Sequence, residues 1–183
     1  MNDNNNKVDT NNTPLVGLGL FPTPTEGLGL DISVADEANY AEILEIQKKA
    51  FYSEALLYQN FNIQPLTQTL EEMQEECKEK VVLKAIVDGK IAGSIRANVF
   101  DGVCWLNKLV VLPEYQRRGI GEKLLCEIET YFLKTEKFIL VTGAKSESNI
   151  RLYQKVGYQI IRKETFCDGV EMVVMKKENV IRH

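Results

Sequence analysis

The chain has 183 residues, of which 44% are hydrophobic, and this is enough for one globular domain with its own core. Its formal net charge of −4 has the wrong sign for a general nucleic-acid binder, so we expect no nucleic-acid partner. The only histidine is His183, the last residue, which excludes Ser-His-Asp and Cys-His catalysis within the fold.

Four cysteines lie far apart, with no Cys-x-x-Cys pair and no histidine nearby, so we expect no metal site and no disulfide framework. No apolar stretch approaches the ~20 residues of a membrane span, and the N-terminus lacks a cationic start followed by an apolar run. These features favour a cytoplasmic protein with no membrane partner.

Residues 1–30 have the composition of a disordered extension. Six of the first twelve residues are asparagine, prolines follow at positions 14, 22 and 24, and Gly-Leu-Gly-Leu occurs twice. Such a segment cannot bury a core. We therefore place the folded domain at residues 31–183.

The regular pattern begins with a short strand at Leu30–Val34, followed by a helix that Asp36 caps. Apolar residues at positions 43, 46, 50 and 51 have helical spacing, and those at positions 66, 70 and 73 mark a second helix. The stretch between the two helices, from Ser53 to Thr67, is polar and aromatic and is interrupted by Pro65.

Three Asp-Gly pairs, at positions 88, 101 and 168, predict β-hairpins because both residues of a type I′ turn favour positive φ. The predicted antiparallel neighbours are Val81–Val87 with Ile91–Phe100, that strand with Val103–Val111, and Gln159–Phe166 with Val170–Lys176.

Two further helices and one strand complete the pattern. The helices are predicted from Gly121 to about Lys134 and over Asn149–Val156, and the strand over Phe138–Thr142. The first of these helices is expected to cross between two parallel strands. The sequence thus predicts an α/β (α+β) fold with a mixed, mostly antiparallel central sheet of about seven strands, flanked by about four helices.

The segment from Leu109 to Leu124 is suited to a polyphosphate. A β-rich run ends at Pro113, and a basic turn containing Gly119 and Gly121 opens a helix. Glycines let ligand oxygens approach the backbone, and the free N–H groups of a first helical turn attract anions. The spacing matches neither a Walker nor a dinucleotide-binding fingerprint.

This turn resembles the central motif of the GNAT superfamily of acyl-CoA-dependent N-acyltransferases, Gln/Arg-x-x-Gly-x-Gly/Ala, which is met by Gln116, Gly119 and Gly121. A second signature of that family, Asn-x-x-x-x-Tyr-x-x-x-Gly-Phe/Tyr, is similar to the stretch from Asn149 to Tyr158. The resemblance spans about residues 31 to 177. It implies a GNAT-like fold and acetyl-CoA as the co-substrate, without a metal.

The resemblance also implies the positions of the site. Acetyl-CoA would lie where the strands Val103–Val111 and Phe138–Thr142 splay apart, with the N–H of Leu109 on the thioester carbonyl and Tyr153 as the acid for the departing thiolate. Asn149 would contact the cofactor or cap its helix, and capping is the favoured alternative. The implied cofactor-binding residues are Leu109, Val110, Val111, Gln116, Arg117, Arg118, Gly119, Ile120, Gly121, Glu122, Lys123, Asn149 and Tyr153.

The chain departs from histone-type members of the family, which place a general-base glutamate four residues before the Leu109 position, where this chain has Trp105. The amine would then lose its proton through water, to a carboxylate from elsewhere such as Glu54, or in solution. The aromatic and polar residues Phe51, Tyr52, Ser53, Tyr58 and Phe61 resemble in position the variable acceptor wall, although packed aromatics at a helix end explain them equally well.

Two functions follow as hypotheses. The first is an N-acetyltransferase, an acyltransferase in which a primary amine attacks acetyl-CoA directly in a ternary complex, with a small molecule or a peptide as the amine acceptor and a homodimer as an open possibility. The alternative is a non-catalytic acyl-CoA-binding or protein-interaction domain of the same fold. Trp105 favours the second hypothesis and the intact Tyr153 favours the first.

Overall fold

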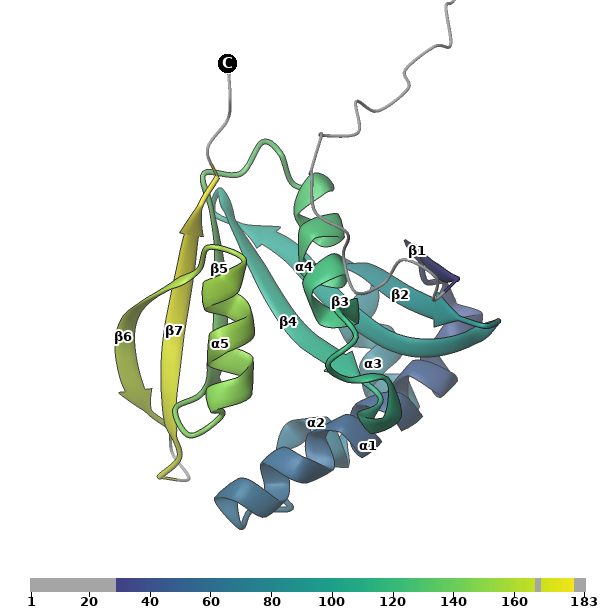
Figure 1. Cartoon of the computed structure of the whole chain (residues 1–183), viewed down its shortest axis with the longest axis horizontal. Coiled ribbons are helices and arrows are strands. Elements are labelled where there is room, and N and C mark those ends of the chain that lie inside the picture. Colours follow the sequence, from purple (N-terminus) through teal and green to yellow (C-terminus); the bar gives the residue numbers. More distant parts are fainter. Residues whose placement is uncertain (1–28, 167–168, 180–183) are drawn as a thin grey trace, which may run out of the picture.

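A computed structural model describes residues 29–166 and 169–179 of the chain (Figure 1). The predicted disordered extension, residues 1–30, lies outside the described residues except for its last two. In the part that the structure describes, no helix is both long enough and apolar enough to cross a bilayer.

A seven-stranded sheet in the order β1-β2-β3-β4-β5-β7-β6 forms the centre of the fold. Its pairs are antiparallel except β4 with β5, so the predicted mixed and mostly antiparallel sheet is confirmed. The strands are β1 (Leu30–Val34), β2 (Val81–Val87), β3 (Lys90–Phe100), β4 (Val103–Val111), β5 (Lys137–Gly143), β6 (Gln159–Thr165) and β7 (Glu171–Glu178). The helices are α1 (Tyr40–Tyr58), α2 (Gln64–Thr67), α3 (Leu70–Cys77), α4 (Ile120–Thr130) and α5 (Glu147–Lys155), with short 3-10 turns at Glu37–Asn39 and Pro113–Tyr115.

The two predicted hairpins whose Asp-Gly pairs lie wholly within the described residues turn at those pairs. Asp88 and Gly89 have φ of 50° and 78°, and Asp101 and Gly102 have φ of 50° and 72°, as type I′ turns require. The pairs β2–β3, β3–β4 and β6–β7 are antiparallel, as predicted.

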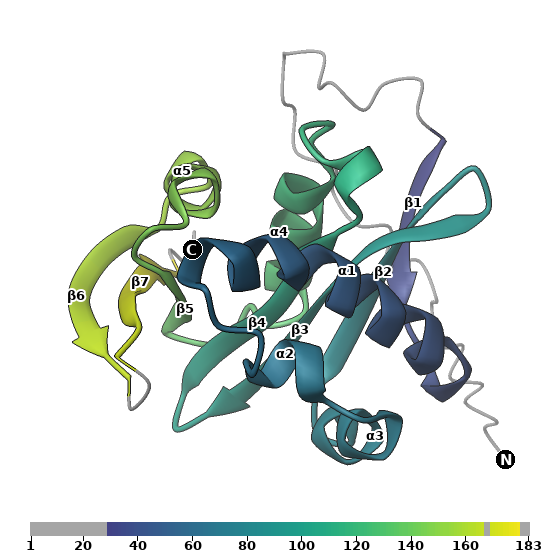
Figure 2. The same cartoon turned by 90° about the horizontal axis from the view of Figure 1, so that it is seen from below.

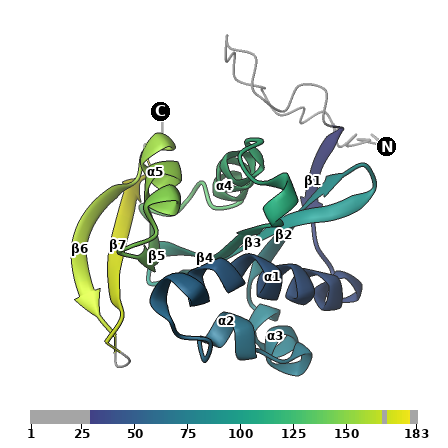
Figure 3. The same cartoon turned by 60° about the horizontal axis from the view of Figure 1, so that its bottom comes forward.

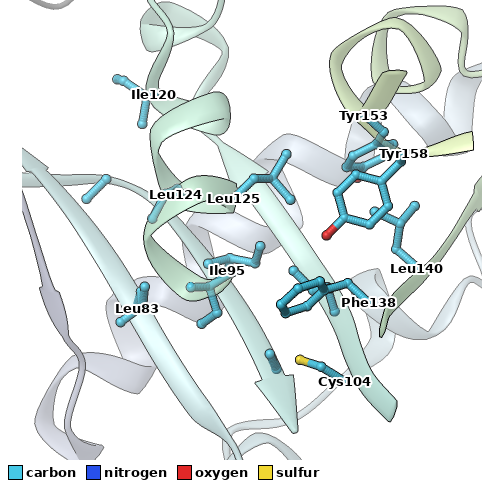
Figure 4. Close-up of a cluster of buried hydrophobic side chains, with 14 of the residues drawn as sticks. Leu83, Ile95, Cys104, Ile120, Leu124, Leu125, Phe138, Leu140, Tyr153 and Tyr158 are labelled. Carbon is cyan, nitrogen blue, oxygen red and sulfur yellow. The ribbon is translucent and has the colours of Figure 1, made fainter. Parts of the chain in front are cut away.

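Helices α4 and α5 cover one face of the sheet, and α1, α2 and α3 cover the other (Figures 2 and 3). Each face has its own core. The α4 side holds a large cluster that includes Leu124, Leu125 and Phe138 (Figure 4), and the α1 side holds a smaller cluster that includes Ile43 and Met73. Burial of apolar side chains on both faces drives this layering.

Several helix boundaries differ from the predictions. Helix α1 continues to Tyr58, because Glu54 to Leu57 are good helix formers, and Gln59 ends it in the left-handed conformation at φ 52°. The predicted second helix is divided into α2 and α3 by a break in which Thr69 forms a capping box with Glu72. Helix α4 ends at Thr130 instead of near Lys134.

Candidate active site

Strand β4 is distorted where the site would form. It pairs with β5 only from Val103 to Trp105 and then separates from it. On its other edge the register with β3 jumps between Asn107 and Val110, which leaves Lys108 and Leu109 opposite the single residue Ile95. Lys108 has a φ of 53°, and this arrangement is a β-bulge. Leu109 therefore belongs to neither register, and the predicted splay of the two strands is observed.

Two cavities meet at this distortion. The larger one, about 680 Å³, is lined by residues from both faces of the sheet: Leu125 of α4 and Tyr153 of α5 on one side, Phe51 of α1 and Gln64 of α2 on the other. The smaller one, about 370 Å³, is lined by the end of β4, the turn before α4, and residues of α1 and α5. Phe51, Glu54, Leu109 and Asn149 line both cavities. The site is thus a passage through the sheet, with Leu109 at the junction.

The turn before α4 presents free backbone donors to the smaller cavity. Arg117 and Gly119 have φ of 60° and 79°, and no backbone N–H from residue 117 to 122 donates to an acceptor among the described residues. Gln116 Nε2 donates to the carbonyl of Val111 at 3.0 Å, which fixes the turn against β4. Such a concavity fits phosphate oxygens.

Glycine is required at the two positions of this turn for different physical reasons. Gly119 is the N-cap of α4, and its φ is positive, a conformation that residues with a side chain rarely adopt. A Cβ at Gly121 would instead lie 3.1 Å from the side chain of Leu152, so this glycine allows α4 to pack close to α5.

Most of the implied cofactor-binding residues line the cavities. Leu109 and Asn149 line both, Tyr153 lines the larger one, and the smaller one is lined by Val110, Val111, Gln116, Arg117, Gly119, Ile120, Gly121 and Glu122. Arg118 and Lys123 line neither, and the Arg118 guanidinium lies 5.3 Å from the ring centre of Tyr115. Lys155, which the sequence analysis did not single out, lines the smaller cavity and pairs with Glu122 at 2.5 Å.

Tyr153 projects from α5 into the layer between α5 and the sheet. Its ring is buried, with 8% of the residue exposed, and lies 6.2 Å from the ring of Tyr158, edge to face (Figure 4). Its hydroxyl makes no hydrogen bond within the described part of the chain, although the residue lines the larger cavity. Burial, and then the charge of Glu54, raise the pKa of Tyr153 above its ordinary value.

Glu54 connects α1 to the start of α5 at the junction of the cavities. Its carboxylate accepts hydrogen bonds from Ser146 Oγ and, at 3.4 Å, from Asn149 Nδ2. One turn further along α1, the Tyr58 hydroxyl accepts a 2.7 Å hydrogen bond from the N–H of Lys145. Together these bonds tie α1 to the β5–α5 loop across the opening between β4 and β5.

The prediction that Asn149 caps its helix is wrong. Helix α5 begins at Glu147, after Ser146, so Asn149 already lies inside the first turn. Its side chain is then free to turn toward Glu54, and it lines both cavities.

The residues of the predicted acceptor wall do not form one continuous surface, because they lie at different positions around α1 and beyond its end. Phe51 and Tyr58 line the larger cavity and Ser53 lines the smaller one. Tyr52 and Phe61 line neither cavity. Their rings contact each other at the surface in a tilted arrangement, 54% and 49% exposed, with ring centres 5.6 Å apart.

Lys108, which the sequence analysis did not single out, belongs to the wall of the larger cavity. Its Nζ donates to Gln64 Oε1 and lies 5.8 Å from the ring centre of Phe51. Burial lowers the pKa of Lys108 to about 8; the charge of Glu76 opposes this shift, and those of Arg96 and Lys80 add to it.

A polar network on the α1 side underlies this wall. The buried Arg96 guanidinium lies 3.3 Å from Glu76 and donates to Gln47 Oε1 at 2.7 Å. Lys80 Nζ bonds Glu76 at 2.8 Å and Asn107 at 3.1 Å, and Asn107 lines the larger cavity. Burial opposes ionisation of Glu76, but the hydrogen bond from Lys80 and the charge of Arg96 prevail and lower its pKa to about 2.

Known proteins resemble this chain in sequence and in fold. Among curated proteins, the uncharacterized protein YyaT of Bacillus subtilis (strain 168) is 25% identical over 146 residues, which are 79% of this chain and 93% of that protein. The structure of the ribosomal-protein-S18-alanine N-acetyltransferase from Escherichia coli matches with a TM-score of 0.68 at 17% identity, over 84% of this chain and 96% of that one. The PaiA N-acetyltransferase from Thermoplasma acidophilum, in complex with coenzyme A, matches with a TM-score of 0.60 at 18% identity, over 81% and 98%.

The similarity to these structures concerns the fold, whereas the family follows from the sequence itself. The family model of the acetyltransferase (GNAT) domain matches residues 36–179, a segment that contains both signature motifs, the splayed strands and the two cavities. The chain belongs to the GNAT acetyltransferase family.

Proposed function

We propose that the protein transfers the acetyl group of acetyl-CoA to a primary amine by direct attack in a ternary complex. The observation that carries this proposal is the junction of the two cavities at Leu109. The smaller cavity has free N–H groups for phosphates, and the larger one passes through the sheet to the α1 side. A thioester and an amine can therefore reach the same point from opposite ends.

The bulge supports a role for the Leu109 backbone. Because Leu109 lies outside both registers, we assign its N–H to the oxygen of the thioester carbonyl. When the amine nitrogen attacks the carbonyl carbon, negative charge develops on that oxygen, and a fixed donor stabilises it. The C–S bond then breaks, and the electron pair leaves on the sulfur of coenzyme A.

We assign to Tyr153 the stabilisation of the departing sulfur. Its hydroxyl has no partner among the described residues and its ring is held by packing against Tyr158, so the group is free to donate to a thiolate. Since its pKa is raised, it serves better as a hydrogen-bond donor that stabilises the thiolate than as a group that gives up its proton fully.

The amine also has to lose a proton. Among the described residues that line the larger cavity, Glu54 is the carboxylate, and it lies where the two cavities meet. We assign to Glu54 the binding of the acceptor ammonium and the acceptance of its proton, directly or through water. Its hydrogen bonds to Ser146 and Asn149 hold it in position for this role.

Release of free thiol from acetyl-CoA, measured across a panel of primary amines, tests the proposal. We expect turnover with at least one amine, and a large loss of kcat in Glu54→Gln with acetyl-CoA affinity retained. If coenzyme A binds but no amine is acetylated, the alternative of a non-catalytic acyl-CoA-binding domain replaces the proposal. The observation that favours this alternative is Trp105, which stands where histone-type members have a glutamate and lines neither cavity.

A further inference from the structure

The wall of the larger cavity contains two side chains of opposite charge. Of the described residues that line it, Glu54 and Lys108 are the charged ones, and the others include apolar residues such as Ile63, Leu140 and Met172. Neither charge has an ion-pair partner within 4.0 Å in the described part of the chain.

Each of the two groups keeps hydrogen-bonding capacity for a ligand. The Lys108 ammonium has three N–H bonds, of which one is given to Gln64 Oε1. The Glu54 carboxylate accepts from Ser146 and Asn149 and retains further lone pairs. A partly buried charge without a counterion is costly, and a ligand that supplies the opposite charge offsets this cost.

We infer that the acceptor is a free amino acid with an apolar side chain, whose ammonium group pairs with Glu54 and whose carboxylate pairs with Lys108. The inference rests on the proposed function and names its substrate class. Glu54 lies at the junction with the smaller cavity, so an amine bound to it would face the thioester. Lys108 lies in the wall of the larger cavity on the α1 side, where its contacts with Gln64 and Phe51 fix it.

The same charges disfavour other classes of amine. A polyamine would bring a second cation close to Lys108, and like charges in a partly buried site repel. The side chain of a lysine within a protein carries no carboxylate beside its amine, so Lys108 would stay unpaired. The apolar lining leaves room for a hydrocarbon side chain.

The first experiment compares free amino acids with their amides as acceptors. Alanine, valine, leucine and phenylalanine are each paired with the corresponding amide, and kcat/KM is measured by thiol release. We expect at least one free acid to exceed its amide by about tenfold or more. This comparison is conservative, because the amide has the less basic amine and more of it is unprotonated at neutral pH.

Substitutions at Lys108 test whether this residue causes the preference for the free acid over the amide. Lys108→Met should bring the ratio of acid to amide close to one, while Lys108→Arg should retain part of it. Both replacements are unbranched, so the positive φ at this position adds no new strain. Lys163→Met, at an exposed lysine of β6, is the control and should leave the ratio unchanged.

A binding measurement keeps the inference testable if no turnover is found. Calorimetry with coenzyme A present compares N-acetyl-leucine with its amide, on the wild-type protein and on Lys108→Met. Tighter binding of the acid, lost in the variant, supports the inference even if the proposed acetyl transfer fails. Equal binding of acid and amide, or faster turnover of a polyamine than of any amino acid, overturns the inference and leaves the proposed transfer standing.

Discussion

Replacement of Tyr153 by phenylalanine separates chemistry from packing at the proposed site. The ring is buried against Tyr158 and the α4-side core, and phenylalanine preserves these contacts. The hydroxyl has no hydrogen bond to lose among the described residues. We therefore expect the free energy of unfolding to stay within about 0.5 kcal/mol of the wild type, because no buried group is left without its partner.

The expected loss of rate follows from what the hydroxyl can donate. A thiol has a pKa of about 8.5 and an unperturbed tyrosine one of about 10, so full proton transfer to the thiolate is uphill by about 2 kcal/mol. Burial raises the pKa of Tyr153 and increases this gap. A hydrogen bond from a neutral donor to an ion contributes about 1.5–3 kcal/mol, so Tyr153→Phe should lower kcat by roughly 10- to 150-fold.

The assay measures kcat at saturating acetyl-CoA and amine, together with acetyl-CoA affinity by calorimetry. Tyr158→Phe is the matched control, because the Tyr158 hydroxyl donates to Glu129 at 2.8 Å and lies outside the residues that line the cavities. We expect the control to lose about 1.5–3 kcal/mol of stability and to keep its kcat. Wild-type turnover in Tyr153→Phe would refute the role of the hydroxyl and assign the thiolate to solvent or to the acceptor.

Gly119→Val should weaken acetyl-CoA binding at least tenfold in calorimetry, since a β-branched side chain fits neither the positive φ nor the phosphate concavity. The control is Gly102→Val, at a turn with φ of 72°. This control should lose about as much stability as Gly119→Val but bind acetyl-CoA normally. Glu76→Gln should cost about 3 kcal/mol in chemical denaturation, because Arg96 stays buried without its carboxylate. Because the folded pKa of Glu76 is depressed, its contribution to stability is present above the ordinary value of 4.5 and is lost as pH falls toward about 2, and the variant should lack this dependence. Binding of N-acetyl-leucine should weaken as pH rises through about 8, where Lys108 becomes neutral, while binding of the amide should not change.

Local signals made most of the sheet predictable. An Asp-Gly pair requires two positive φ angles and leaves few alternatives to a hairpin, so three antiparallel pairs followed directly from the sequence. Helix ends were harder to predict, because tertiary contacts act on them together with local helix propensity. The end of α1 at Tyr58 is held by Lys145, a residue far along the chain, and no local pattern reveals such a bond.

The loop that would hold the phosphates was predictable because it is continuous in sequence, whereas the acceptor half is assembled from α1, α2 and β4. Lys108 did not stand out, since a lysine in a strand usually faces solvent. A signal was nevertheless present: Cys104 and Leu106 alternate as core residues, and after two polar residues Leu109 and Val111 resume the alternation one position late. This shift of the alternation by one position indicates an extra residue in the strand.

The bulge matters differently to the fold and to the proposed reaction. Removing residue 108 would leave Leu106 and Leu109 on their present face, so both cores would survive, but Leu109 would enter the regular ladder opposite Ile95. Replacing its side chain would instead preserve the backbone distortion. Under the proposed function, substrate preference at this position can therefore change through point mutations, whereas a single-codon deletion would be expected to yield a stable and inactive protein.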